Sequence, residues 1–317
     1  MAAASTESEV VVPIGSHHDS STVHWNNEPG GADPQVCPTS DRFMDRSLIA
    51  RELPSRRRDL LYAHLTGAPV PGINQEEVDA HFQGMPARYW EQVGEAQLLW
   101  DLQTVHAFLA KLNDPDSADT PVAVDWRREP ESGLTKALVC TWDRHGLLAK
   151  IAAAFGAMRA NIIRADVYTR ADNVVLDSFE VCDLDCAPMA DRTRLQAAAF
   201  LIEGALCEPP RFASVWAAQA HKVRPHPHQM TPRVHTNNHS SPEYTVLRVE
   251  ASDRRGLLYD VLQAFADCGV NVAQAIVNTV DGVALDVFYL VDLEGRKILS
   301  PPQIRRIRRA VPRAIVS

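Results

Sequence analysis

The feature that most constrains this chain is an internal repeat with a period of about 110 residues. A D-R-x-G-L-L motif occurs twice, at Asp143–Leu148 and at Asp253–Leu258. Each copy is followed by an apolar stretch and then by an asparagine, Asn161 or Asn271. An A-x-x-x-T pattern and an L-D-x-F pattern follow both asparagines. Because motif order and spacing agree, we expect one structural unit to occur twice in tandem.

Hydrophobic periodicity assigns the same elements to both copies: a strand, a helix, a hairpin of two strands and a second helix. In the first copy we predict them at 136–142, 146–158, 161–169, 174–183 and about 190–206. In the second copy we predict them at 244–251, 256–267, 270–279, 283–292 and about 301–310. A fourth strand would complete each unit. Its candidates are 212–216 or 233–236 in the first copy and 314–317 in the second.

The residues outside the repeat complete the organisation of the chain. Residues 1–40 are rich in Ser, Asn, Gly, Pro and His, which is typical of a disordered tail. Asn74, three residues before Glu77, indicates a capped helix start. An apolar stripe at helical spacing follows: Leu98, Leu102, Val105, Leu109 and Leu112. We therefore predict a tail at 1–40, a helical connector at 41–115, a first module at 134–210, a linker that can hold an extra strand at 211–242, and a second module at 243–317.

Composition narrows the classes of function. The formal net charge of −8 argues against a general nucleic-acid binder, which needs a basic surface. No apolar run reaches the length of a membrane-spanning helix, and the first residues lack the pattern of a secretory signal. The six cysteines form no C-x-x-C pair. We expect a cytoplasmic protein with reduced thiols, no cofactor and no bound metal.

The repeated motifs resemble those of ACT domains, and most of all the tandem pair at the C-terminus of the bifunctional protein-PII uridylyltransferase/uridylyl-removing enzymes. Two further segments resemble the same family: Phe82–Trp90 with His106 looks like its helical connector, and Val234–Ser241 like the strand before its second ACT domain. The resemblance implies an α+β fold of two tandem ferredoxin-like βαββαβ (ACT) modules. It also implies a ligand at the junction of the modules, with glutamine as the first candidate.

The catalytic motifs of that family are missing. Gly15-Ser16 is present, but no D-x-D pair follows to hold the magnesium ions of a nucleotidyltransferase. Only His18-Asp19 matches the H-D doublet of the hydrolytic domain. We therefore expect a non-catalytic regulatory protein that senses a small amino acid and contacts a protein partner or a second copy. The alternatives are a diverged enzyme with residual activity and a ligand-free ACT interaction module.

The turn between strand and helix suits a free amino acid. A helix start offers backbone N–H groups and a positive dipole end for a carboxylate. We expect Gly146-Leu147 and Gly256-Leu257 to let the ligand approach, and Asp143 or Asp253 to receive its ammonium group. Asn161 and Asn271 begin the adjacent strands and can bond either end of the ligand.

A purely structural explanation stays open for each of these residues: the aspartates can cap a helix, the glycines ease a turn, and the asparagines accept an unusual backbone angle. The copies also depart from the family, which usually has proline where His145 and Arg255 stand. The second copy has Gly269 after its first helix, whereas the first has Arg159, so we expect the two helix ends to differ.

One basic cluster lies near the C-terminus: Arg305, Arg306, Arg308 and Arg309. Cations at the end of the last predicted helix suit the negative end of its dipole. A partner surface is the alternative explanation.

Overall fold

The computed structural model describes residues 54–67, 70–114, 121–129, 132–207 and 230–316, and the backbone of two short paired strands, β1 (Ser8–Val10) and β2 (Val23–Trp25). The predicted disordered tail otherwise lies outside these residues, although β1 and β2 themselves are strands that the prediction did not include. The strand candidate at 212–216 and most of the predicted linker also lie outside them.

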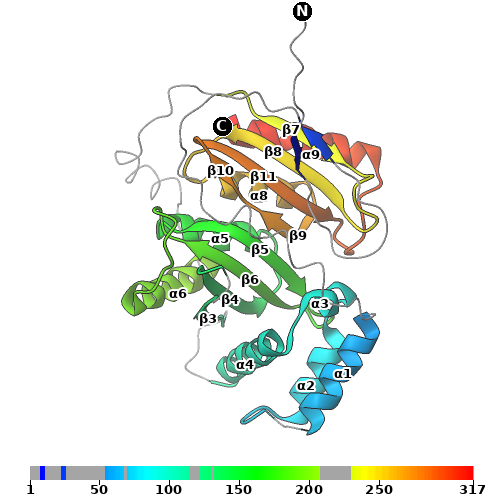
Figure 1. Ribbon diagram of the computed structural model, residues 1–317, viewed down its shortest axis with the longest axis vertical. Coiled ribbons are helices and arrows are strands. Elements are labelled where there is room, and N and C mark those ends of the chain that lie inside the picture. The colour runs from blue at the N-terminus through cyan, green and yellow to red at the C-terminus, as the bar shows by residue number, and fades with distance from the viewer. Residues whose placement is uncertain are drawn as a thin grey trace, which may run out of the picture.

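The fold is α+β, and one antiparallel sheet runs through both repeats (Figure 1). Its strands are, in spatial order, β3 (Ala123–Arg128), β4 (Thr135–Trp142), β6 (Val174–Cys182), β5 (Asn161–Thr169), β9 (Asn271–Ile276), β11 (Val283–Val291), β8 (Thr245–Ser252) and β7 (Arg233–Asn237), with the short β10 (Thr279–Val280) paired to β11. Four helices pack on one face: α5 (Leu147–Ala157), α6 (Arg192–Cys207), α8 (Leu257–Asp267) and α9 (Pro301–Val316). We call β3 to α6 the first repeat unit and β7 to α9 the second.

The fourth strand of each unit precedes the unit rather than following it. β3 pairs antiparallel with β4, and β7 pairs antiparallel with β8, so the element order is ββαββα. The predicted strand at 314–317 is therefore wrong, because 314–316 belong to helix α9. The candidate strand at 233–236 does form, as part of β7, but it belongs to the second unit and not to the first. Ile307, Val311 and Ile315 are buried at steps of four, which continues the apolar stripe of the helix to its last turn.

The two units are joined by β5 and β9, which pair over Arg164↔Ile276, Ala165↔Ala275 and Asp166↔Gln274. Ala165 and Ala275 hold the same position in the two repeats, since each begins the A-x-x-x-T pattern. A pair of equivalent residues facing each other across antiparallel strands defines a pseudo-twofold axis between them. Contacts made by one unit across this joint can therefore be compared with the equivalent contacts of the other.

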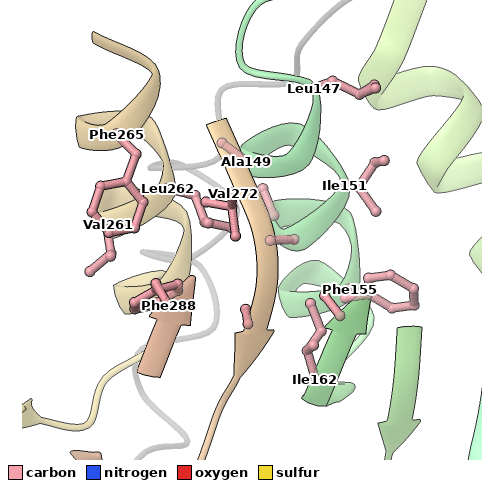
Figure 2. Packing of buried hydrophobic residues seen from close by; sticks show 14 of the residues in the cluster. Leu147, Ala149, Ile151, Phe155, Ile162, Val261, Leu262, Phe265, Val272 and Phe288 are labelled. Carbon is pink, nitrogen blue, oxygen red and sulfur yellow. The ribbon is translucent and has the colours of Figure 1, made fainter. Parts of the chain in front are cut away.

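Both units share one hydrophobic core beneath the helices (Figure 2). In α5 the buried side chains include Ile151 and Phe155, and in α8 Val261 and Phe265. Figure 2 shows Val272 of β9 between these two helices. The apolar positions recur at helical spacing in both helices, which explains why the repeat prediction placed them correctly.

The opposite face of the first unit is covered by a helical segment. It consists of α1 (Pro54–Gly67), α2 (Gln75–Gly84), α3 (Ala87–Gln92) and α4 (Glu95–Leu112). The expected cap of α2 is present, because Asn74 Oδ1 accepts a hydrogen bond from the Glu77 amide at 2.9 Å. Leu138, Cys140 and Leu176 alternate along β4 and β6 with core residues and pack against these helices. None of the described helices is long and apolar enough to cross a membrane.

Candidate functional site

The first helix of each unit begins at a glycine in the left-handed region. Gly146 has a φ of 69°, and Gly256 has a φ of 81°. Both hold the N-cap position, and neither helix start has a side-chain capping bond. A side chain at either position would be strained, so glycine is needed here for backbone geometry as well as for any ligand approach.

The aspartates of the motif lie exposed in the turn before each helix. The Asp143 amide donates to the Asn173 oxygen and the Asp253 amide to the Gly282 oxygen, both at 2.8 Å. These bonds tie each turn to the hairpin of its own unit. Asp253 Oδ2 also accepts a hydrogen bond from Thr279 Oγ1 at 3.2 Å. The carboxylates are therefore positioned beside the helix starts and are not themselves the N-cap residues.

The leucines of the motif are not placed to meet a ligand with their side chains. Leu147 and Leu257 are buried in the shared core. Their amides donate to Arg144 and Arg254 oxygens within the turn, both at 3.1 Å. Their contribution is to anchor the turn.

The arginine of the D-R-x-G motif has a role that the sequence did not suggest. Arg144 Nη1 donates to the Leu206 oxygen in α6 at 3.0 Å. Arg254 Nη2 donates to the Ile315 oxygen in α9 at 2.9 Å. Each arginine thus binds the carbonyl end of the second helix in its unit, where a cation offsets the helix dipole. Recurrence of the arginine in both copies was the available signal.

The helix start of the first unit contacts the second unit. A β-carbon on Gly146 would lie 3.4 Å from Gln263 Oε1 in α8. Gln263 Nε2 donates to Asp267 Oδ1 at 2.9 Å, and His145 Nε2 lies 4.0 Å from the same oxygen. A side-chain amide of one unit therefore already lies against the helix start of the other.

The predicted asparagines Asn161 and Asn271 are the first residues of β5 and β9, the strands that meet at the joint, and both are exposed. The Val277 amide donates to the Ile163 oxygen at 3.0 Å. Asn161 Nδ2 donates to the Asp183 oxygen of its own unit at 3.3 Å. Among the described residues, no hydrogen bond joins the Asn161 side chain to the Gly146 or the Gly256 turn.

Two buried carboxyl groups lie beneath this region. Asp177 in β6 and Asp286 in β11 come from the repeated L-D-x-F pattern, and each is only 1% exposed. Neither carboxyl oxygen of Asp177 has a hydrogen-bond partner among the described residues. Burial raises its pKa well above the usual range, and the nearby Asp143 raises it further. Burial likewise raises the pKa of Asp286 to about 8, although the Asn278 amide hydrogen bond opposes this.

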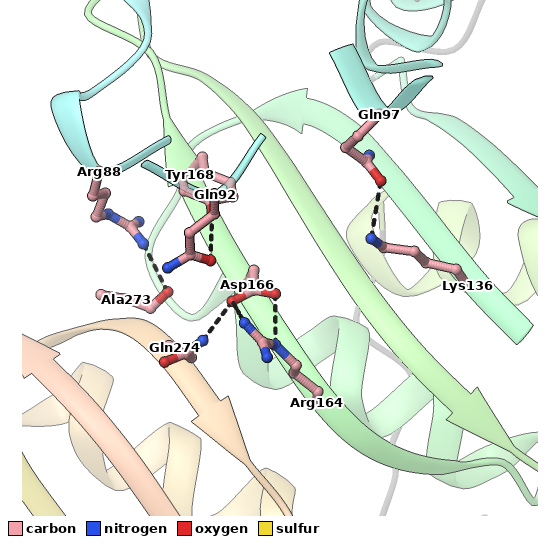
Figure 3. A network of polar contacts seen from close by, with 9 residues as sticks. All are labelled: Arg88, Gln92, Gln97, Lys136, Arg164, Asp166, Tyr168, Ala273 and Gln274. Atoms are coloured by element: carbon pink, nitrogen blue, oxygen red, sulfur yellow. Dashed lines mark hydrogen bonds and ion pairs between the residues drawn. The ribbon is translucent and has the colours of Figure 1, made fainter. Parts of the chain in front are cut away.

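A polar network lies at the joint itself (Figure 3). Arg164 Nε donates to Asp166 Oδ2, and Gln274 Nε2 donates to Asp166 Oδ1, both at 2.8 Å. Burial acts to raise the pKa of Asp166, but the Arg164 charge and these hydrogen bonds hold it below its usual value. The network fixes the two units side by side. The sequence prediction missed this network, because the hydrophobic periodicity of one repeat carries no information about contacts between the repeats.

The expected difference between the two helix ends is not observed. Arg159 has a φ of 60°, and Gly269 has a φ of 67°. In both units the backbone therefore leaves the helix through the same left-handed conformation. The first unit reaches it with a residue that carries a β-carbon, at a conformational cost. Within the described ranges, no group of three His, Cys, Asp or Glu side chains is placed to hold a metal ion.

Comparison with known proteins adds two findings. Residues 233–316, the second repeat unit, match a family model described as an ACR9-like, ACT-like domain. The chain is also similar to proteins named bifunctional uridylyltransferase/uridylyl-removing enzyme. That of Gluconobacter oxydans is 30% identical over 281 residues, covering 86% of this chain and 28% of the relative. That of Rhodospirillum rubrum is 29% identical over 296 residues, covering 92% and 30%.

A third relative, from Rhodopseudomonas palustris, is 31% identical over 227 residues, covering 70% of this chain and 24% of the relative. The chain thus spans less than a third of the length of these relatives. Residues 233–316 form an ACT-like domain, in a chain that resembles the bifunctional uridylyltransferase/uridylyl-removing enzymes over most of its own length.

Proposed function

We propose that this chain is a non-catalytic regulatory protein that senses an amino acid at the joint between its repeat units. The second repeat unit is ACT-like, and the first, with the same element order, is proposed to be a second ACT module. We place the effector site at the Gly256 turn, with Asp253 and Asn271, and take glutamine as the first ligand to test. Its action is proposed to lie in cytoplasmic nitrogen or amino-acid metabolism.

The observation that carries the proposal is the carboxamide of Gln263. Its oxygen lies beside the Gly146 helix start, where the positive end of a helix dipole favours an oxygen atom. The first helix start is therefore already occupied by a side-chain amide from the other unit. Because that side chain is a glutamine, a carboxamide is the group that we expect such a turn to accept.

The equivalent position at the second helix start has no amide. The repeat offset of about 110 residues relates Gln263 to Ala153, and Asp267 to Ala157. Both are small side chains without a polar group. We propose that a free amino acid supplies the missing carboxamide at Gly256, while its ammonium group pairs with the exposed carboxylate of Asp253.

Isothermal titration of the full chain against the twenty amino acids tests the proposal. We expect glutamine to bind once per chain. Asp253→Asn keeps the shape of the side chain and removes its charge, which should weaken binding by about ten- to a hundredfold. Asp143→Asn is the matched control at the first helix start and should leave the affinity unchanged.

Two results would contradict the proposal. If no amino acid binds, the chain is a ligand-free interaction module. The contact of Gln263 with the Gly146 turn would then be a packing contact between the two units. If Asp253→Asn binds as tightly as the wild type, the ligand lies elsewhere. An assay for nucleotidyl transfer to a PII-type protein should give only the buffer background. Metal-dependent turnover above that background would favour the diverged-enzyme alternative.

A further inference from the structure

Helix α9 presents a row of arginines that its own folding explains only in part: Arg306 Nη2 donates to the Asp267 oxygen at the end of α8, at 2.6 Å. Arg305, Arg306, Arg308, Arg309 and Arg313 are all exposed. The helix runs to Val316, so four of the five lie in its middle, and only Arg313 lies in its last turn. The helix-dipole explanation therefore fails for Arg305 to Arg309, since that effect is confined to the terminal turns.

Three of these arginines lack an ion-pair partner in the part of the chain that the structure describes. Among the described residues, no carboxylate forms an ion pair with Arg305, Arg309 or Arg313. By contrast, Arg164 and Arg254 pair with Asp166 and Asp260.

Their spacing makes the row unfavourable for the isolated helix. Arg305, Arg309 and Arg313 follow one another at steps of four, so neighbouring guanidinium groups face each other along one side of the helix. Like charges in this arrangement destabilise a helix, and an anion that binds between them removes the repulsion.

The arginines gather around a hollow in the surface. Its volume is about 420 Å³, and it is lined by Pro302, Arg305, Arg306, Arg309, Ala310 and Arg313. We call these four arginines the α9 arginine face. No acidic residue lines the hollow. The whole chain carries a net charge of −8, so the α9 arginine face is a local reversal of the overall charge.

Exposed apolar side chains flank both ends of α9. Leu299, which lies two residues before the helix, is 71% exposed, and Val316 at its end is 73% exposed. Leu293 is 63% exposed and lies next to Gly269, whose oxygen accepts a hydrogen bond from Gln303 of α9. Arginine is enriched at protein–protein interfaces, and the exposed aliphatic side chains add apolar area beside it that a partner can cover.

We propose that the α9 arginine face docks a segment of a partner protein in which carboxylates alternate with apolar side chains. Carboxylates pair with the guanidinium groups, with two parallel hydrogen bonds where the geometry allows. The apolar side chains cover Leu299 and Val316. A nucleic acid fits less well, because the negative chain around this short patch repels a long polyanion and the flanking leucines give it nothing to bind.

The full-length chain can be tested with a fluorescein-labelled synthetic helix that has glutamate at every fourth position and leucines beside them. We expect a change in fluorescence anisotropy on binding, at physiological salt. The triple variant Arg305→Glu, Arg309→Glu, Arg313→Glu should weaken binding by more than about tenfold. Glutamate is a good helix former, so α9 should keep its fold, as circular dichroism can verify.

The matched control changes the same charge at exposed arginines elsewhere: Arg56→Glu, Arg128→Glu and Arg192→Glu. It should bind as the wild type does. Leu299→Ser should weaken binding of the leucine-containing peptide but not binding of a peptide with serine in place of leucine. The proposal is overturned if the α9 variant binds as tightly as the control, if no peptide binds, or if duplex DNA or inorganic triphosphate binds more tightly than the peptide.

Discussion

Arg88 of α3 donates a hydrogen bond from Nη1 to the backbone oxygen of Ala273 in β9, at 3.1 Å (Figure 3). Its Nη2 donates to the Val167 oxygen in β5. The guanidinium carbon also lies 4.4 Å from the centre of the Tyr168 ring. One side chain from the helical segment therefore holds both strands that meet at the joint. The units cannot separate unless these bonds break, so the helical segment is linked directly to the arrangement of the repeats.

Removal of the Arg88 side chain should weaken the joint. We expect Arg88→Ala to lower the free energy of unfolding by about 3 kcal/mol, because charged hydrogen bonds to two buried carbonyl groups are lost. Urea denaturation measures the change. Hydrogen exchange of the Val277 amide, which bonds across the joint, should become faster. Arg128→Ala, an exposed position, is the control, and an equal loss there would show that Arg88 has no special role.

Replacing the strained arginine after α5 should stabilise the protein. Arg159→Gly removes the β-carbon from a residue in the left-handed region, so we expect the free energy of unfolding to rise by about 1 kcal/mol. The reverse change in the other unit, Gly269→Arg, should cost a similar amount. Thermal unfolding of both variants is the measurement. A destabilising effect of Arg159→Gly would mean that the Arg159 side chain makes a contact worth more than the strain.

Asp286 should make the protein less stable as the pH rises. Its folded pKa of about 8 lies above the ordinary value of 3.8, so the native state binds a proton that the unfolded state releases between these values. Stability from this group is complete below pH 3.8 and is lost as the pH rises toward about 8.

The side chain of the Asp286→Asn variant stays neutral, so its free energy of unfolding should vary less with pH. Near pH 8 this variant should be more stable than the wild type. Urea denaturation across this pH range tests it. Parallel curves for the two proteins would contradict the assignment. Asp177→Asn should act in the same direction, since burial raises the pKa of that carboxyl as well.

Shortening Gln263 should open the first helix start. The amide of Gln263 lies beside Gly146, and Gln263→Ala would give that position the residue found at Ala153 in the other unit. If glutamine binds at Gly256, calorimetry should find one binding site per chain in the wild type and two in the Gln263→Ala variant. Asp143→Asn should then remove only the new site. A stoichiometry that stays at one would show that Gln263 does not occupy a ligand position.

Periodicity predicted most elements of the two units, because buried strands and helices repeat their apolar residues with a fixed period. The edge strand β3 escaped it, and β7 was predicted only as a candidate strand of the first unit, at 233–236. β3 is short, contains Arg127 and Arg128, and has only one buried residue, so its sequence resembles a polar break. β7 has no buried residue at all. Edge strands face solvent and depend on a neighbour for their conformation, which leaves little hydrophobic pattern to read.

The candidate site was predicted as residue types and not as a spatial arrangement. The sequence placed the glycine turns correctly, since only glycine suits their backbone angles. It did not show that Gln263 of the second unit lies against the Gly146 turn of the first, because that follows from the packing of α5 beside α8. The buried carboxyls could have been found, since Asp177 has the same strand parity as the core residues Val175 and Phe179.

The pairing of Ala165 with Ala275 places within one chain a contact that separate subunits would otherwise form. Tethered halves remain associated at any protein concentration, so dilution does not disassemble the joint. Two identical subunits would have to carry the same residue on both sides of their axis, whereas this chain has Gln263 on one side and Ala153 on the other. If the proposed effector site is correct, this divergence leaves one binding site per chain, and we expect a hyperbolic response with a Hill coefficient of about one.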